Sequence, residues 1–160
     1  MQPLRLAPTA LALLALACAK DPAPAAAYQG EPAAVVSETC DPASLRDTTE
    51  GRACVFIERF ASGEGPEAAR GQWVRVHYVA LLPGGAQLDS SHGDKPLYFK
   101  LGHSNDVISG VHEGVEGMQV GERRRITVPP KLGYRGRKLP GVPPDANLTF
   151  LVELVDLAQG

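Results

Sequence analysis

The sequence predicts an α+β fold in which a sheet of about five antiparallel strands is covered by one short helix. Apolar and polar residues alternate with period two in several segments of 53–157, whereas a single segment, 109–118, spaces its apolar residues as a helix does. The apolar face of an antiparallel sheet needs a cover, and that segment is the candidate for it. We therefore expect one small folded domain over 53–160.

The strand predictions rest on which residues share a face. In 73–79, Val74, Val76 and Tyr78 fall on one side, and in 147–157 the clearest apolar side begins with Leu148 and Phe150. A Pro-Gly-Gly sequence at 83–85 predicts a tight turn after the first of these strands. The remaining strands are predicted at 55–60, 87–89 and 123–128.

The helix and the loop that follows it are predicted from spacing and composition. Val111, Val115 and Met118 recur at i, i+4 and i+7 within 109–118. Glycines at 110, 114 and 117 make this a poor isolated helix, so packing must hold it. The Gly- and Pro-rich segment 133–144 has no periodicity, and we expect it to form an ordered flap over one end of the sheet.

The N-terminus has the pattern of a secretory signal, predicted over 1–17. Arg5 precedes an apolar run at 11–17, and Cys18 follows it. Two cleavage sites stay open: a bacterial lipoprotein site that leaves a lipid on Cys18, which we favour, or an ordinary site before Lys20. The first predicts a lipid-anchored protein of the bacterial cell envelope, at the outer membrane or periplasmic side, and the second a soluble periplasmic protein.

Residues 18–52 are rich in Ala and Pro and predict a flexible tether. If Cys18 carries lipid, Cys40 and Cys54 remain as a candidate disulfide pair in an oxidising compartment, although spacing alone leaves open that both are unpaired.

Charge excludes some functions. Sixteen basic and eighteen acidic residues give a formal charge of -2, so no field draws this chain to nucleic acid. The basic run 123–125 is interpreted as the solvated face of a strand beside Ile126 and Val128. The four histidines have no metal-binding spacing. We expect neither a metal nor a cofactor, and a membrane contact through the lipid only.

A series of short motifs in fixed order resembles the FKBP-type peptidyl-prolyl isomerase family. The resemblance covers nearly the whole domain and implies a twisted antiparallel sheet wrapped around a short helix. The motifs include Gly63-Glu64-Gly65, Val76-His77-Tyr78, Asp89-Ser90-Ser91, Val107-Ile108-Ser109-Gly110, Val120-Gly121-Glu122-Arg123, Pro143-Pro144 and Leu148-Thr149-Phe150.

The resemblance also implies the site. It gives the catalytic roles to three positions: the Ile108 N–H and the Tyr134 hydroxyl bond to carbonyl groups of the ligand, and the Asp89 carboxylate orients the pocket. The implied pocket walls are Tyr78, Leu88, Leu97, Phe99, Val107, Val111, Leu139 and Phe150. The family's best-known members have phenylalanine at the positions of Leu88 and Leu97, tryptophan at Val111 and often histidine at Leu139, so this cup should be wider and less aromatic.

Such a cup suits rotation about an Xaa-Pro amide. The barrier to this rotation is about 18–20 kcal/mol and arises from C–N resonance. The carbonyl oxygen of a half-rotated amide depends less on hydration than that of a planar amide. A dry apolar pocket therefore favours the twisted form without a nucleophile or a metal. The sequence predicts an isomerase that assists folding of exported proteins, with proline-containing polypeptides as substrates and a macrolide as a candidate inhibitor. A weakly active or non-catalytic proline-binding or chaperone module of the same fold is the alternative, and a purely structural lipoprotein is a third class.

Overall fold

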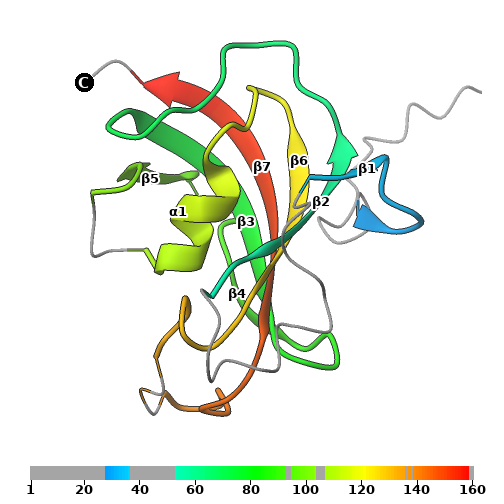
Figure 1. The fold of residues 1–160 in the computed structure, drawn as a ribbon, viewed down its shortest axis with the longest axis vertical. Coiled ribbons are helices and arrows are strands. Elements are labelled where there is room, and N and C mark those ends of the chain that lie inside the picture. The colour runs from blue at the N-terminus through cyan, green and yellow to red at the C-terminus, as the bar shows by residue number, and fades with distance from the viewer. Residues whose placement is uncertain are drawn as a thin grey trace, which may run out of the picture.

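The structure is a computed structural model that describes residues 28–36, 53–92, 95–103, 107–135, 137 and 139–158. Within these residues, seven strands form one antiparallel sheet, and a single helix lies against one face of it (Figure 1). The helix α1 is Ser109–Val115. The strands are β1 Ala34–Val35, β2 Phe56–Ala61, β3 Trp73–Leu81, β4 Gln87–Ser90, β5 Leu97–Lys100, β6 Arg123–Val128 and β7 Leu148–Ala158.

The strand order is β1-β2-β6-β7-β3-β4, and β5 also pairs with β3. Two strands, β5 and β4, pair with the same edge of β3. The first half of β3 pairs with β5, where Val76 lies opposite Leu97, and the second half pairs with β4, where Val79 lies opposite Ser90. The predicted α+β class is therefore confirmed. Two strands, β1 and β5, were not predicted.

The core lies between α1 and the sheet. Val111 and Val115 are buried there, and α1 packs closely against β6 through Gly110 and Gly114. A Cβ added to Gly110 would lie 2.3 Å from Val128 Cγ1, and one added to Gly114 would lie 2.4 Å from Ile126 Cδ1. The glycines that weaken this helix in isolation are thus the residues that permit its packing.

The interpretation of 123–125 as a solvated run is wrong for Arg124. This side chain is 3% exposed, on the same face of β6 as Ile126 and Val128. Its Nε atom lies 2.6 Å from Glu122 Oε1. Its other nitrogens donate to main-chain carbonyls at the end of α1, at 3.0 Å to Gly114, 3.0 Å to Glu116 and 2.9 Å to Gly117. A charged residue can be buried here because it satisfies carbonyls that a helix end leaves without partners.

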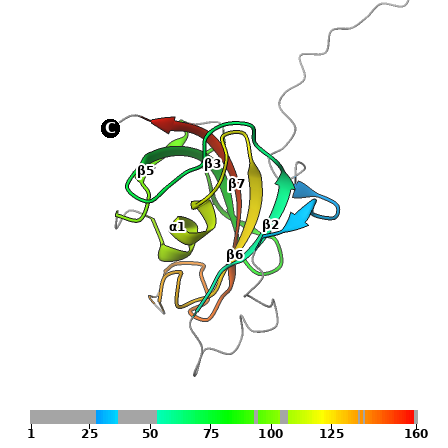
Figure 2. The same ribbon diagram turned by 45° about the horizontal axis from the view of Figure 1, so that its top comes forward.

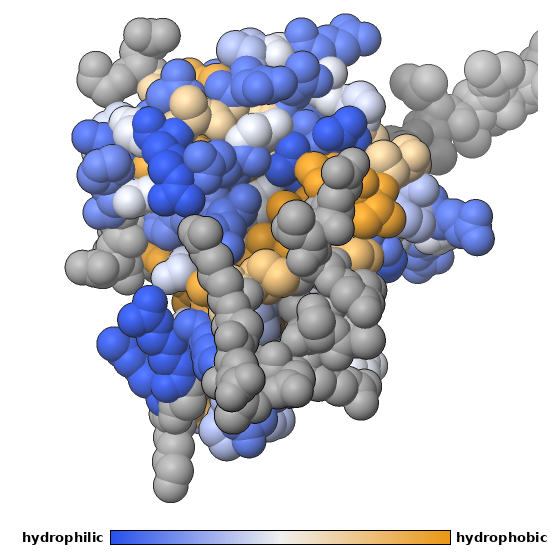
Figure 3. Space-filling view, in the orientation of Figure 1, coloured by the Kyte–Doolittle hydropathy of each residue, from blue (hydrophilic) through white to orange (hydrophobic). Residues whose placement is uncertain are grey.

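Part of the predicted tether belongs to the folded unit. Tyr28 is buried against the outer face of the sheet, where its ring centroid lies 5.7 Å from that of Phe60, and β1 pairs with β2 (Figure 2). The space-filling view shows an apolar area near this edge of the sheet (Figure 3), and Val35 of β1 is exposed. The rest of 18–52 lies outside the described residues, so the tether and the domain boundary at 53 stay predictions.

The predicted signal at 1–17, the lipid site Cys18 and Cys40 also lie outside the described residues. Cys54 is disulfide-bonded, and the structure describes no second cysteine, so its pairing with Cys40 stays a prediction. No helix in the described ranges has the length and apolar character that crossing a membrane requires.

Candidate active site

A cavity of about 160 Å³ opens between the sheet, the start of α1 and the flap at 133–144. A void of about 150 Å³ is enough for a benzene ring, so this one has room for the five-membered ring of proline. The described residues that line it come from four strands (β3, β4, β5 and β7), from α1, from the loop before α1 and from the flap. They are Val76, Tyr78, Ala80, Asp89, Leu97, Val107, Ile108, Val111, Tyr134, Phe150 and Val152.

All three residues predicted as catalytic, Asp89, Ile108 and Tyr134, line this cavity, as do five of the predicted wall residues, Tyr78, Leu97, Val107, Val111 and Phe150. Sequence reasoning missed Val76, Ala80 and Val152 as lining residues. The alternation in β3 contained the signal for two of them, because Val76 and Ala80 share a face with Tyr78.

Three predicted wall residues do not line the cavity. Phe99 faces the core from β5, where its ring meets that of His112 edge-on at 5.3 Å. Leu88 is half-buried and packs against the core beside the cavity. Leu139 is 36% exposed at a bridge with Val142 in the flap. Position in a family motif therefore did not by itself give the direction of these three side chains.

A fixed carboxylate stands at the rim. The Tyr78 hydroxyl donates to Asp89 Oδ2 at 2.6 Å, and the Ser90 N–H donates to Asp89 Oδ1 at 2.8 Å. Burial, then the hydrogen bond to Asp89, raise the pKa of Tyr78 far above its ordinary range. Tyr78 therefore remains a hydrogen-bond donor, and Asp89 is held in one orientation.

Two further donors remain unused. Among the described residues, neither the Tyr134 hydroxyl nor the Ile108 N–H has a hydrogen-bond partner. Burial, then the negative charge of Asp89, raise the pKa of Tyr134, so its phenol stays protonated. Ile108 is the N-cap of α1 in an extended conformation, with φ -64° and ψ 149°. Both groups can thus donate to carbonyl oxygens of a bound chain.

The lining that the structure describes contains one carboxylate, two phenols and otherwise apolar side chains. In the part of the chain that the structure describes, no three His, Cys, Asp or Glu side chains gather closely enough to hold a metal ion. What the arrangement offers is shape, low polarity and directed donors.

Comparison with known proteins agrees with this geometry. Residues 65–155 match the family model described as FKBP-type peptidyl-prolyl cis-trans isomerase. The chain is 44% identical over 114 residues to FK506-binding protein 4 of Mycosarcoma maydis, an alignment that spans 71% of this chain and 30% of that protein. It is 42% identical over 103 residues, 64% of its own length and 25% of the relative's, to a peptidyl-prolyl cis-trans isomerase of Saccharomyces cerevisiae.

Two solved structures are similar in fold and in sequence. The crystal structure of AtFKBP13 has a TM-score of 0.58 and 34% identity, covering 65% of this chain and 93% of that one. FkpA from Escherichia coli has a TM-score of 0.58 and 32% identity, covering 64% of this chain and 47% of that one. This chain spans about a quarter to a third of the curated relatives named above. It belongs to the FKBP-type peptidyl-prolyl cis-trans isomerase family.

Proposed function

We propose that the chain is a peptidyl-prolyl cis-trans isomerase that takes a proline ring into the cavity of about 160 Å³. The observation that carries the proposal is the pairing of an apolar cup with two unused donors, the Ile108 N–H and the Tyr134 hydroxyl, at its wall. These donors can hold a bent peptide in place by its carbonyl groups while the amide turns.

Catalysis then follows from a difference in solvation. The planar amide is strongly polarised, and its oxygen loses favourable hydration on entering an apolar site. The twisted amide has lost C–N resonance, so its oxygen loses less hydration free energy there. The cup walls, among them Val107, Val111 and Phe150, therefore disfavour the ground state more than the transition state. Asp89 contributes by orienting Tyr78 and not by exchanging a proton with the substrate.

The test is a cis/trans exchange assay on short Xaa-Pro peptides, with Tyr134→Phe as the variant. Loss of one hydrogen bond, worth about 0.5–1.5 kcal/mol, should lower kcat/KM roughly twofold to twelvefold and leave stability unchanged. The matched control is Tyr98→Phe, because Tyr98 stacks on Trp73 outside the cavity. Exchange no faster than in buffer would replace the isomerase with a proline-binding or chaperone module of the same fold.

We also propose that the cavity binds FK506, the ligand in the names of several relatives. The valine at 111 gives such a ligand less contact surface than an aromatic floor would, so binding should be weaker than an aromatic floor allows. Competition between FK506 and a proline peptide would measure this, and FK506 that leaves peptide exchange unaffected at high concentration would reject it.

A further proposal concerns where the chain works. The signal pattern at 1–17 and the cysteine at 18 support export and a lipid anchor at the bacterial cell envelope, with exported proteins as substrates. The mass of the native chain and of Cys18→Ala would show a lipid as a mass difference. An unmodified N-terminus at Lys20 would reject the anchor and leave a soluble periplasmic protein.

A further inference from the structure

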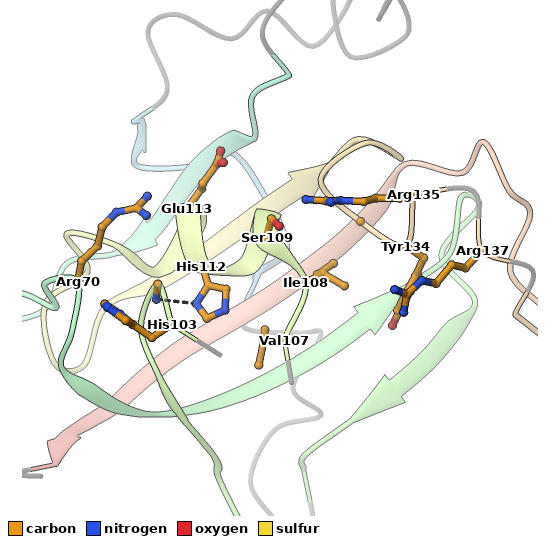
Figure 4. Close-up of a pocket in the computed structure, with 12 residues that line it drawn as sticks. Arg70, His103, Val107, Ile108, Ser109, His112, Glu113, Tyr134, Arg135 and Arg137 are labelled. Carbon is orange, nitrogen blue, oxygen red and sulfur yellow. Dashed lines mark hydrogen bonds between the residues drawn. The ribbon is translucent and has the colours of Figure 1, made fainter. Parts of the chain in front are cut away.

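A second and larger cavity adjoins the first. It measures about 840 Å³ and shares Val107, Ile108 and Tyr134 with the proline cavity, so the two lie on either side of a common wall. In Figure 4, Arg70 and His103 lie on the left of this cavity, and the chain that carries Tyr134 lies on its right. A space of this volume is roughly 12 Å across, room for about three extended residues at about 3.3 Å each.

The described lining of this cavity is rich in cations. Two arginines on the flap side, Arg135 and Arg137, are exposed and make no ion pair with the described residues. Arg70 is already paired with Glu116, at 2.8 Å. Glu113 is the one carboxylate in the described lining. Among the described residues of the lining, two positive charges therefore remain for a ligand, and we call this space the arginine cavity.

The backbone ties both arginines to the proline site. The Arg137 N–H donates to the Tyr134 carbonyl at 3.0 Å, and the Arg135 N–H donates to the Pro130 carbonyl at 3.0 Å. Arg135 has φ 53°, and it is the one described residue other than glycine with a positive φ. Glycine or asparagine would adopt this conformation at less cost.

We propose that the arginine cavity binds an acidic residue of the substrate, so that the isomerase prefers Asp or Glu within about three residues of the Xaa-Pro pair. The inference rests on the proposed isomerase function, since Ile108 and Tyr134, the proposed donors to the substrate, line both cavities. Exposed ion pairs are individually weak, so the two arginines together should give roughly a twofold to tenfold preference for Glu over Gln. Salt near 1 M should abolish it, because the Debye length there is about 3 Å.

The experiment compares proline peptides that differ by one Glu or Gln, placed in turn at each of the three positions before and after the Xaa-Pro pair. Both kcat/KM for exchange and Kd are measured with the full chain. Wild type should prefer Glu at one position or more. Arg135→Gln combined with Arg137→Gln should lose that preference, and Arg135→Glu combined with Arg137→Glu should instead prefer Lys over Gln at the same position.

The control removes the same charge elsewhere. Arg75→Gln combined with Lys100→Gln lowers the net charge equally, and neither residue lines either cavity, so the preference for Glu should persist. Equal rates and equal Kd values for Glu and Gln at every position would overturn the inference. If wild type fails to accelerate any peptide, the isomerase proposal falls, while the ratio of Kd values still decides whether the arginine cavity selects acidic chains.

Discussion

Replacing Arg124 with methionine should destabilise the domain far more than the same change at its half-buried neighbour Arg125. Methionine keeps most of the apolar stem of arginine but loses the guanidinium, which bonds to Glu122 at 2.6 Å and to three main-chain carbonyls at the end of α1. The change therefore leaves a buried carboxylate with one cation, Arg59 at 2.9 Å, and leaves carbonyls at the helix end unpaired.

The magnitude follows from that loss. Removing one partner of a buried ion pair costs about 3–5 kcal/mol, chiefly because the other charge stays buried. The free energy of unfolding of natural domains is about 5–15 kcal/mol, so the variant should still fold at low temperature. Arg125→Met breaks a more exposed pair with Glu58, at 2.6 and 2.7 Å, and should cost about 1 kcal/mol.

Urea unfolding of the two variants beside wild type is the assay. With a slope of about 1–3 kcal/mol/M, Arg124→Met should lower the midpoint by roughly 1 M or more, and Arg125→Met by much less. A second change, Glu122→Gln in the Arg124→Met background, should recover part of the loss by removing a buried charge that keeps Arg59 as its one cation. Equal midpoints for Arg124→Met and Arg125→Met would refute the assignment of Arg124 as the buried residue that ties α1 to the sheet.

Three further outcomes are expected from the same contacts. Gly114→Ala should lower the free energy of unfolding by about 1–3 kcal/mol, despite the better helix propensity of alanine. Adding Ile126→Val, which removes the methyl group 2.4 Å from the new Cβ, should restore part of that free energy. An unchanged melting temperature of Gly114→Ala would contradict this. Burial favours a raised pKa for Glu122, but hydrogen bonds from Arg124 and a backbone N–H, with the nearby arginine charges, hold the pKa below its ordinary value. Wild type should thus have a larger free energy of unfolding than Glu122→Gln above pH about 4.3, and this difference should disappear as the pH falls through the lower pKa of the folded state. Denaturation at several pH values would measure the difference. A difference that does not change with pH would count against this reasoning. Tyr28→Ala should lower the free energy of unfolding by about 3 kcal/mol, as thermal unfolding would measure. Equal stability of variant and wild type would mean that packing of this ring on the outer face of the sheet does not stabilise the fold.

The sequence predicted the strands whose pattern is long and regular. In β7, Leu148, Phe150, Val152 and Leu154 are all buried as the alternation requires. The strand β5 was missed because it is short and follows a proline, and because its place is decided by pairing with β3, where Val76 lies opposite Leu97. Such a partner is distant in sequence, and no local pattern shows it.

The site was predicted less completely than the fold, for a related reason. Order and spacing of motifs indicated which backbone positions approach the cavity, and Asp89, Ile108 and Tyr134 lie there. Motif position did not give the direction of every side chain, because Phe99 lies in the core and packs on His112. Arg124 was misread because charge alone predicts exposure, whereas three carbonyls at one helix end can compensate a buried guanidinium.

The cavity and the core are made of the same side chains. Val76, Val111, Phe150 and Val152 belong to the buried cluster between α1 and the sheet, and they also line the proline cavity. The site is therefore the part of the helix–sheet interface that the core side chains leave unfilled. Because Ile108 immediately precedes α1, any change that moves this helix on the sheet also moves a donor at the cavity wall. Packing at Gly110 and Gly114 thus sets the shape of the site as well as the stability of the fold.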